Sequence, residues 1–205
     1  MLQYDARQHI ELFHLLFLDQ LGHKLDPNLY ALKGGCNLRF FFNSIRYSED
    51  INLDVKTIHK NTLHNKVENI FKSVPFKQIL LTKGIEIISI SAPKQTDTTQ
   101  RWKLSLQIKT STIPLNTKIE FSRRGLQDEV KFEAIKSEII QRYHLPPIML
   151  NHYSVAAALQ QKIMALANRI QTQARDIFDI YILLSTQGEI LPYESKIHTF
   201  LHKAQ

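Results

Sequence analysis

Two neighbouring glycines are the first feature of this sequence that could do chemistry. Gly34 and Gly35 stand side by side in a chain with six glycines in all, directly after a short predicted strand and before a predicted helix. Without side chains, such a turn lets a phosphate approach backbone N–H groups, and the dipole of the following helix favours the negative charge. A glycine pair in a tight turn more often serves the turn alone. The pair therefore indicates a phosphate-binding site only if other functional residues accompany it.

Acidic and amide side chains alternate along the next predicted strand. Asp50, Asn52 and Asp54 lie on one face of residues 49–55, and apolar residues lie on the other. Glu120 stands between two apolar neighbours on a later strand. Carboxylates gathered on one face repel each other unless a cation lies between them, and Mg²⁺ prefers such hard oxygen ligands together with the phosphates of a nucleotide. The pattern predicts that Asp50, Asn52 and Glu120 bind Mg²⁺; for any one of them alone, a solvated sheet face is the simpler interpretation.

A third group of residues lies in the helical C-terminal part. Lys162, Arg169 and Asp176 are spaced by seven, which places them on nearly one stripe if the helix is unbroken, whereas a turn after Arg169 would alter this. A basic stripe can face a triphosphate. The alternative is a local ion pair between Arg175 and Asp179, which lie four residues apart.

The elements that must position these residues follow from hydrophobic periodicity. The first helix is expected to begin at a capping box of Asp5 and Gln8 and to end before Gly22. We expect further helices at 37–42, 63–74, 76–83, 154–170, 174–185 and 193–203, and strands at 29–33, 49–55, 85–92, 101–108 and 119–121.

Early strands and late helices predict an α+β fold with a mixed sheet and a C-terminal helical cap. Pro146 and Pro147 cannot continue a helix, and every residue after them is expected to be helical. The expected division is therefore a core of residues 1–147 and a helical cap subdomain of residues 148–205, with the site between them.

Composition narrows the choice of partners. The formal net charge is +7 and the pI is about 9.4, a balance that suits a polyanion such as nucleic acid, although a generic basic surface gives the same numbers. The chain has no apolar run long enough for a bilayer and no secretory pattern at its N-terminus. It has one cysteine, Cys36. We expect a cytoplasmic protein without a membrane partner.

The motifs together resemble a known family. Residues 33–39, Lys-Gly-Gly-Cys-Asn-Leu-Arg, and residues 46–52, Arg-Tyr-Ser-Glu-Asp-Ile-Asn, resemble the first two motifs of the AbiEii/AbiGii toxin family of nucleotidyltransferases, in the DNA polymerase β-like superfamily. Lys162, Ala165, Leu166 and Arg169, followed by Arg-Asp-Ile-Phe-Asp-Ile at 175–180, are similar to that family's helical signature. The motifs occur in the family's order.

The resemblance implies a function and roles for individual residues. The implied reaction moves a nucleoside monophosphate from an NTP to an acceptor hydroxyl, with RNA and tRNA ends as acceptors, Mg²⁺ as cofactor and a cognate antitoxin as partner. It implies catalytic roles for Asp50, Lys162 and Asp176, and nucleotide binding by Gly34, Gly35, Arg46, Ser48, Lys162 and Arg169. Lys162 would contact the phosphates or help pyrophosphate leave.

One residue departs from the family pattern. The family usually carries a carboxylate where this chain has Asn52, and an amide oxygen brings no charge to Mg²⁺. Asp54 lies on the same strand face, but its distance along the strand argues against direct substitution. The alternative function is therefore a nucleotide- or RNA-binding protein that kept the cleft without catalysis. A third is a nucleotidyltransferase that modifies proteins.

Three other features are interpreted as structural. Cys36 is expected to be a small residue near the start of a helix rather than a nucleophile. Trp102 is expected in the core, and His198 with His202 has metal-ligand spacing but no evident third ligand.

Overall fold

The computed structural model describes residues 4–126, 129–171 and 173–186. Its helices are α1 (Ala6–Lys24), α2 (Gly34–Phe41), α3 (Lys60–Lys72), α4 (Val74–Thr82), α5 (Ser137–Arg142), α6 (Val155–Ala167) and α7 (Ala174–Thr186), with a short 3-10 helix, η1, at Pro27–Leu29. Its strands are β1 (Tyr30–Lys33), β2 (Asp50–Val55), β3 (Ile85–Gln95), β4 (Thr99–Ile108), β5 (Leu115–Ser122), β6 (Val130–Ala134) and β7 (Met149–Tyr153). The predicted helix at 193–203, with His198 and His202, lies outside the described residues.

The strands form one mixed sheet in the order β3-β4-β5-β2-β1-β7-β6. β2 runs parallel to β5 and β1 parallel to β7, while the other neighbours are antiparallel. The α+β class and the mixed sheet predicted from the sequence are confirmed.

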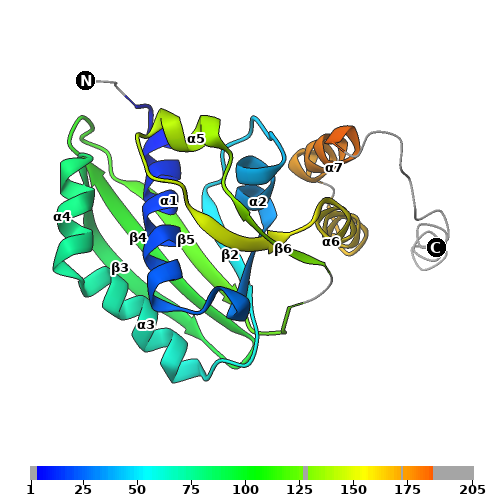
Figure 1. Ribbon diagram of the computed structural model, residues 1–205, viewed down its shortest axis with the longest axis horizontal. Helices are drawn as coiled ribbons and strands as arrows, with labels where there is room; N and C mark the ends of the chain where they lie inside the picture. The colour runs from blue at the N-terminus through cyan, green and yellow to red at the C-terminus, as the bar shows by residue number, and fades with distance from the viewer. Residues whose placement is uncertain (1–3, 127–128, 172, 187–205) are drawn as a thin grey trace.

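One face of the sheet packs against helices α1, α3 and α4 (Figure 1). Alternation along β4 turns Trp102, Leu104, Leu106 and Ile108 into this layer, where each is at most 2% exposed. The Trp102 ring packs edge-on against Phe121 and its Nε1 donates to the Glu68 carboxylate at 3.0 Å. The prediction that Trp102 belongs to the core is confirmed.

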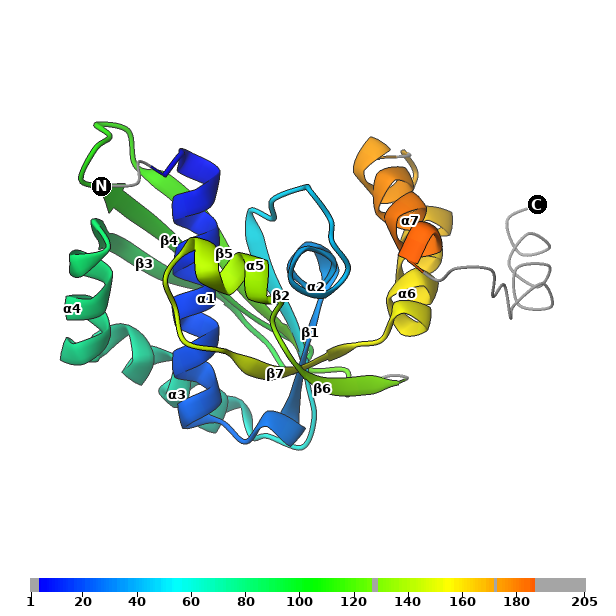
Figure 2. The same cartoon turned by 45° about the horizontal axis from the view of Figure 1, so that its top comes forward.

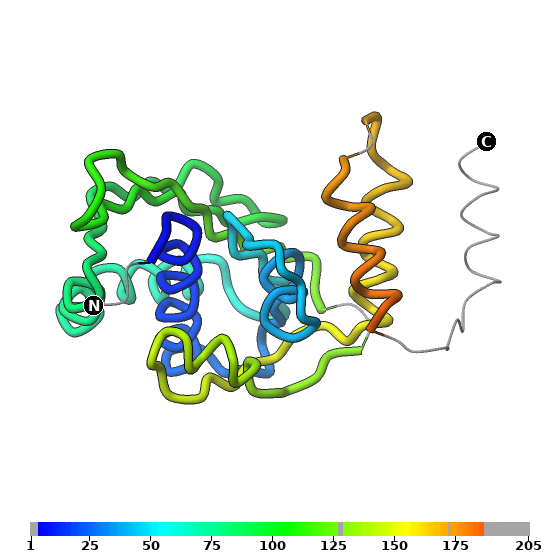
Figure 3. The backbone as a smooth tube through the Cα atoms, turned by 90° about the horizontal axis from the view of Figure 1, so that it is seen from above, coloured from blue at the N-terminus to red at the C-terminus, as the bar shows by residue number. Residues whose placement is uncertain are grey.

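The C-terminal helices α6 and α7 stand beside α2, at the end of the molecule opposite α3 and α4 (Figures 1 and 3). Figure 2 shows α2 between the sheet and this helical pair. The segment that leads into α6 is β7, which is part of the sheet. The prediction that everything after Pro147 is helical is therefore wrong, and the C-terminal helices begin only after Tyr153.

Several predicted boundaries also move. α1 continues through Gly22 to Lys24, because its C-cap is Leu25, whose N–H bonds to the Leu21 carbonyl. The capping box of Asp5 and Gln8 is present as predicted. α2 begins at Gly34 and not at residue 37, and strand β6 and helix α5 were not predicted.

Candidate active site

A hollow of about 560 Å³ lies between the sheet and the C-terminal helices. Nine of the predicted site residues line it: Gly34, Gly35, Arg46, Ser48, Asp50, Asn52, Lys162, Arg169 and Asp176. Glu120 is not among its lining residues. Segments more than a hundred residues apart in the chain thus meet at one cavity.

The glycine pair permits the close approach of three side chains. Gly34 has φ +67°, a left-handed conformation that other residues adopt only with strain, and a Cβ there would lie 3.4 Å from the Asn52 amide nitrogen. A Cβ on Gly35 would lie 2.7 Å from the Ser48 hydroxyl and 3.2 Å from Nη2 of Arg46. Both glycines occupy the first turn of α2, where backbone N–H groups have no partner within the helix. The absence of side chains at both glycines therefore lets Asn52, Ser48 and Arg46 pack against the turn.

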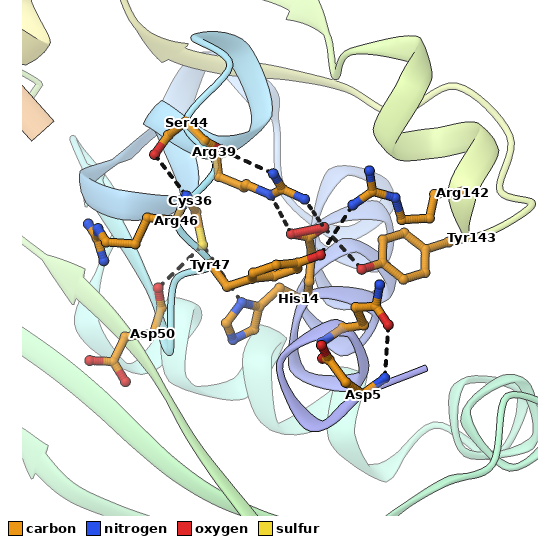
Figure 4. Close-up of polar contacts among 12 residues, drawn as sticks. Asp5, His14, Cys36, Arg39, Ser44, Arg46, Tyr47, Asp50, Arg142 and Tyr143 are labelled. Carbon is orange, nitrogen blue, oxygen red and sulfur yellow. Dashed lines mark hydrogen bonds and ion pairs between the residues drawn. The ribbon is translucent and has the colours of Figure 1, made fainter. Parts of the chain in front are cut away.

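The loop between α2 and β2 carries Arg46 and Ser48. Its conformation depends on Arg39, whose Nη1 donates to the Ser44 carbonyl at 3.0 Å and whose guanidinium lies 4.4 Å from the centre of the Tyr47 ring (Figure 4). Ser48 in turn donates to the Asp50 carbonyl at 2.8 Å. The loop is held at both of its ends.

Arg39 is itself fixed by a buried carboxylate. Glu11 of α1 is 4% exposed and accepts from Arg39 Nε at 2.7 Å and from the Tyr143 hydroxyl at 3.0 Å. Although burial alone lowers the pKa of Arg39, the bond to Glu11 raises it above its usual value. Sequence patterns gave no sign of this network, because Glu11 lies within an apolar helix stretch.

Cys36 of α2 contacts the backbone at Asp50, where the loop after α2 enters β2. Its Sγ lies 3.3 Å from the Asp50 carbonyl, and burial raises the pKa of its thiol to about 12 (Figure 4). A thiol held protonated is a poor nucleophile, which agrees with the structural role expected for Cys36.

Strand pairing places the acidic residues on one sheet face. In the parallel register of β2 and β5, Asn52 lies opposite Glu120 and Asp50 lies opposite Lys118. Asp50, Asn52 and Glu120 therefore share a face of adjacent strands, as predicted. Their carboxylates have cationic partners from the sheet itself: Lys118 Nζ is 2.8 Å from Asp50, and Arg101 Nε is 2.6 Å from Glu120.

The donor set fits Mg²⁺ in its chemistry, because two carboxylates and an amide offer the oxygen ligands that this ion prefers. Within the described ranges, no group of three or more His, Cys, Asp or Glu residues could hold a metal, so an ion here depends on the Asn52 amide or on ligands from a nucleotide. The assignment of Asp50, Asn52 and Glu120 as ligands stays a prediction.

Asp54 has a different role from these three residues. It is 5% exposed, and its carboxylate accepts from Lys33 Nζ at 2.5 Å and from the Tyr153 hydroxyl at 2.8 Å. It joins β2 to β1 and β7 and does not line the hollow. Asp54 is therefore no substitute for the carboxylate missing at Asn52.

Across the hollow, two buried carboxylates of α7 hold three cations. Asp176 and Asp179 are 2% and 0% exposed. Lys162 Nζ lies 2.6 Å from Asp179 and 3.6 Å from Asp176, and Arg169 Nε lies 3.2 Å from Asp176. The third cation, Arg46, reaches Asp179 from the loop after α2 at 2.9 Å.

The sequence left the stripe of Lys162, Arg169 and Asp176 dependent on an unbroken helix. The two separate helices that were expected are present, since α6 ends at Ala167 and α7 begins at Ala174, so these residues meet across the turn between the helices. A second prediction, the ion pair between Arg175 and Asp179, needs correction. Asp179 takes Arg46 and Lys162 as its ion-pair partners and not Arg175, because its side chain points into the cluster while Arg175 lines the hollow.

The charges around the hollow favour an anion. Among the described residues that line it, the cations are Arg7, Arg46, Lys118, Lys162, Arg169 and Arg175, and the carboxylates are Glu49, Asp50 and Asp176. The acids lie largely on the sheet side and the arginines and Lys162 largely on the side of the helices. This arrangement is suited to a polyphosphate that is bound at one end by cations and at the other by a metal.

Solved structures of other proteins have a similar fold. The fold is similar to that of JHP933 from Helicobacter pylori (TM-score 0.64, 21% identity, 91% of this chain and 69% of that one) and to a putative nucleotidyltransferase from H. pylori (TM-score 0.64, 21% identity, 90% and 71%). It is also similar to MenT4, a nucleotidyltransferase toxin from Mycobacterium tuberculosis H37Rv (TM-score 0.62, 22% identity), covering 84% of this chain and 56% of MenT4. No curated protein sequence matches the chain.

Residues 16–205 match the family described as nucleotidyl transferase AbiEii toxin, type IV TA system. The chain belongs to this family of nucleotidyltransferase toxins, as its motifs predicted. In the part of the chain that the structure describes, no helix is long and apolar enough to cross a membrane.

Proposed function

We propose that the protein transfers a nucleoside monophosphate from an NTP to the terminal hydroxyl of an RNA, with tRNA ends as the preferred class, and that this activity inhibits growth unless a cognate antitoxin opposes it in the cytoplasm. The observation that carries the proposal is the hollow that Asp50 and Asn52 line from the sheet while Lys162, Arg169 and Arg46 line it from the opposite side.

Each wall has a role in this reaction. Arg46, Ser48, Lys162 and Arg169, with the first-turn N–H groups of Gly34 and Gly35, bind the triphosphate. Asp176 orients Lys162 and Arg169 through its ion pairs with both side chains. Asp50, Asn52 and Glu120 would hold a Mg²⁺ ion, whose charge would stabilise the phosphoryl oxygens.

The chemical step exchanges one bond at phosphorus for another. The acceptor oxygen forms a bond to the α-phosphorus while the bond from that phosphorus to the bridging oxygen breaks, and pyrophosphate leaves with the bonding electron pair. Asp50, which lines the hollow from the sheet side, takes the proton of the acceptor hydroxyl. Lys162 neutralises the charge that develops on the leaving pyrophosphate.

A second candidate function has one observation in its favour. Asn52 stands where the family usually has a carboxylate, which lowers the negative charge available to a metal. A protein with this site could bind nucleotide or RNA without turning it over.

Incubation with each labelled NTP, Mg²⁺ and total RNA tests the proposal. We expect label in RNA from the wild type and none from Asp50→Ala. Both proteins should bind NTP, which calorimetry measures. NTP binding without incorporation would favour the binding protein, and label in protein in place of RNA would change the acceptor class.

A further inference from the structure

A second hollow, of about 570 Å³, adjoins the first on the sheet surface. The two share Glu49, Asp50 and Lys118. The second extends from there across β5, β4 and β3, on the face turned away from α1, and no described helix covers that face (Figures 1 and 3). It is therefore an open extension of the site.

Strand register arranges its polar side chains in a row. Lys118 lies opposite Asp50, Lys103 opposite Lys118, and Ser91 opposite Lys103. Because neighbouring strands are about 4.8 Å apart, the row from Asp50 to Ser91 crosses three spacings, roughly 14 Å. A second row, of Asn116, Ser105 and Ser89, runs beside it.

These side chains have the chemistry that contacts nucleic-acid backbones. Ammonium, hydroxyl and amide groups are the usual partners of phosphate and sugar oxygens. Lys103 is exposed and takes part in none of the ion pairs within the described residues, whereas Lys118 pairs with Asp50. A cation without a local carboxylate is available to a phosphate from outside.

The two faces of β4 differ sharply in exposure. Lys103 is exposed on one face, whereas its neighbours Trp102 and Leu104 are 0% and 2% exposed on the other. The polar face is thus a continuous surface that leads to Asp50, and it agrees with the net charge of +7.

We infer that this second hollow binds the last nucleotides of a single-stranded RNA acceptor, with its backbone along the row from Ser91 through Lys103 to Lys118 and its terminal hydroxyl delivered at Asp50. The delivery of the terminal hydroxyl at Asp50 rests on the proposed function, whereas RNA binding by the second hollow does not depend on it. RNA is favoured over an acidic protein segment because the row offers evenly spaced donors and lies beside the catalytic carboxylate.

The test uses the full chain and a fluorescent single-stranded RNA 12-mer with a free 3′ hydroxyl. Anisotropy titrations at several salt concentrations compare the wild type with Lys103→Glu and with the control Lys77→Glu, which reverses an exposed charge on α4, on the covered side of the sheet. We expect Lys103→Glu to weaken RNA binding about tenfold and to reduce the salt slope by about 1. Lys77→Glu should change neither, and Lys103→Gln should give a smaller loss in the same direction.

The outcomes separate the inference from the proposed function. NTP affinity by calorimetry should be the same in Lys103→Glu and the wild type, because Lys103 lines only the second hollow. If RNA binding depends on Lys103 but no nucleotide is ever incorporated, the surface stands and the proposed reaction fails. If the wild type extends RNA while Lys103→Glu matches Lys77→Glu in affinity, KM for RNA and salt slope, the inference is overturned. It is also overturned if a polyglutamate peptide binds as tightly as the RNA and loses affinity equally in Lys103→Glu.

Discussion

Arg46 and Asp179 are joined by three hydrogen bonds of 2.9 to 3.2 Å, although 133 residues separate them in the chain. The Asp179 carboxylate also lies 2.6 Å from Lys162 Nζ. One fully buried acid on α7 thus holds two cations, from α6 and from the loop after α2, and both cations line the hollow. Asp179 does not line it, so it acts on the site through Arg46 and Lys162.

The first prediction follows from this geometry. Asp179→Asn keeps the shape of the side chain but removes the charge that two partly buried cations face, so the free energy of unfolding should fall by about 2–3 kcal/mol. NTP affinity should also fall, because Arg46 and Lys162 lose their common anchor. Chemical denaturation and calorimetry measure the two effects.

Asp97→Asn serves as the matched control for Asp179→Asn. Asp97 is 91% exposed in its pair with Lys60, so its loss should cost less than about 1 kcal/mol. Asp179→Glu should recover part of the NTP affinity if positioning is the role. Equal destabilisation by Asp97→Asn and Asp179→Asn would contradict the prediction that the buried Asp179 carboxylate stabilises the fold.

The acidic face of the sheet could be predicted from sequence because alternation in a strand fixes which side chains share a face. Asp50 and Asn52 needed only that rule, and pairing then placed Glu120 beside Asn52. Strand β7 could not be found in this way. Its residues Met149–Tyr153 follow two prolines, do not alternate cleanly, and pair with β1 more than a hundred residues earlier.

The roles of Asp179 and Glu11 were hidden for a similar reason. Within its own helix, Asp179 has Arg175 one turn away, and local spacing alone favours that pair. The partner it takes instead, Arg46, is near only after the sheet and the C-terminal helices have met. Long-range ion pairs of this kind depend on tertiary packing, which periodicity does not encode.

The second prediction concerns the glycine turn. In Gly35→Ala the new Cβ would lie 2.7 Å from the Ser48 hydroxyl and 3.2 Å from Arg46 Nη2, so both side chains must move from their places in the hollow. We expect NTP affinity to fall about tenfold, which corresponds to about 1.4 kcal/mol. Calorimetry measures the affinity.

Gly22→Ala provides the comparison for Gly35→Ala. Gly22 lies inside α1, and a Cβ there would meet only the Tyr30 hydroxyl, at 3.6 Å. Alanine should stabilise the helix by up to about 1 kcal/mol and leave NTP affinity unchanged. If Gly35→Ala also left the affinity unchanged, Ser48 and Arg46 would not contact the nucleotide.

The third prediction is a pH dependence of stability. His14 is buried, with one ring nitrogen 2.7 Å from the Thr117 hydroxyl, and burial lowers its pKa from 6.5 to about 3. Between these values the unfolded chain binds a proton that the folded protein does not. The free energy of unfolding should therefore decrease as pH falls below 6.5, by up to about 1.4 kcal/mol per pH unit from this residue.

Denaturation curves at pH 7, 6 and 5 test this dependence on His14. His14→Gln should flatten the acid-side slope, since glutamine does not titrate and can still bond to Thr117. His23→Gln should leave the slope as it is, because the His23 side chain is 70% exposed. A slope that survives in His14→Gln would assign the acid sensitivity to other groups, such as His152, whose pKa burial also lowers.

The fourth prediction separates catalysis from binding alone. Asn52→Asp places a carboxylate between Asp50 and Glu120 on the acidic face, which should strengthen Mg²⁺ binding and raise the rate of nucleotide transfer about tenfold. Asp50→Ala should abolish transfer. Asn61→Asp adds the same charge at an exposed position of α3, so its rate should equal that of the wild type.

The measurement of Asn52→Asp must be made at saturating Mg²⁺. Without metal, the added negative charge repels the triphosphate and lowers the affinity for NTP. At saturation the metal neutralises that charge, and the remaining difference is transition-state stabilisation. A rate that falls in Asn52→Asp would mean that the site is tuned to the amide, whose side chain lies against Gly34. Transfer that persists in Asp50→Ala would remove the acidic face from catalysis altogether.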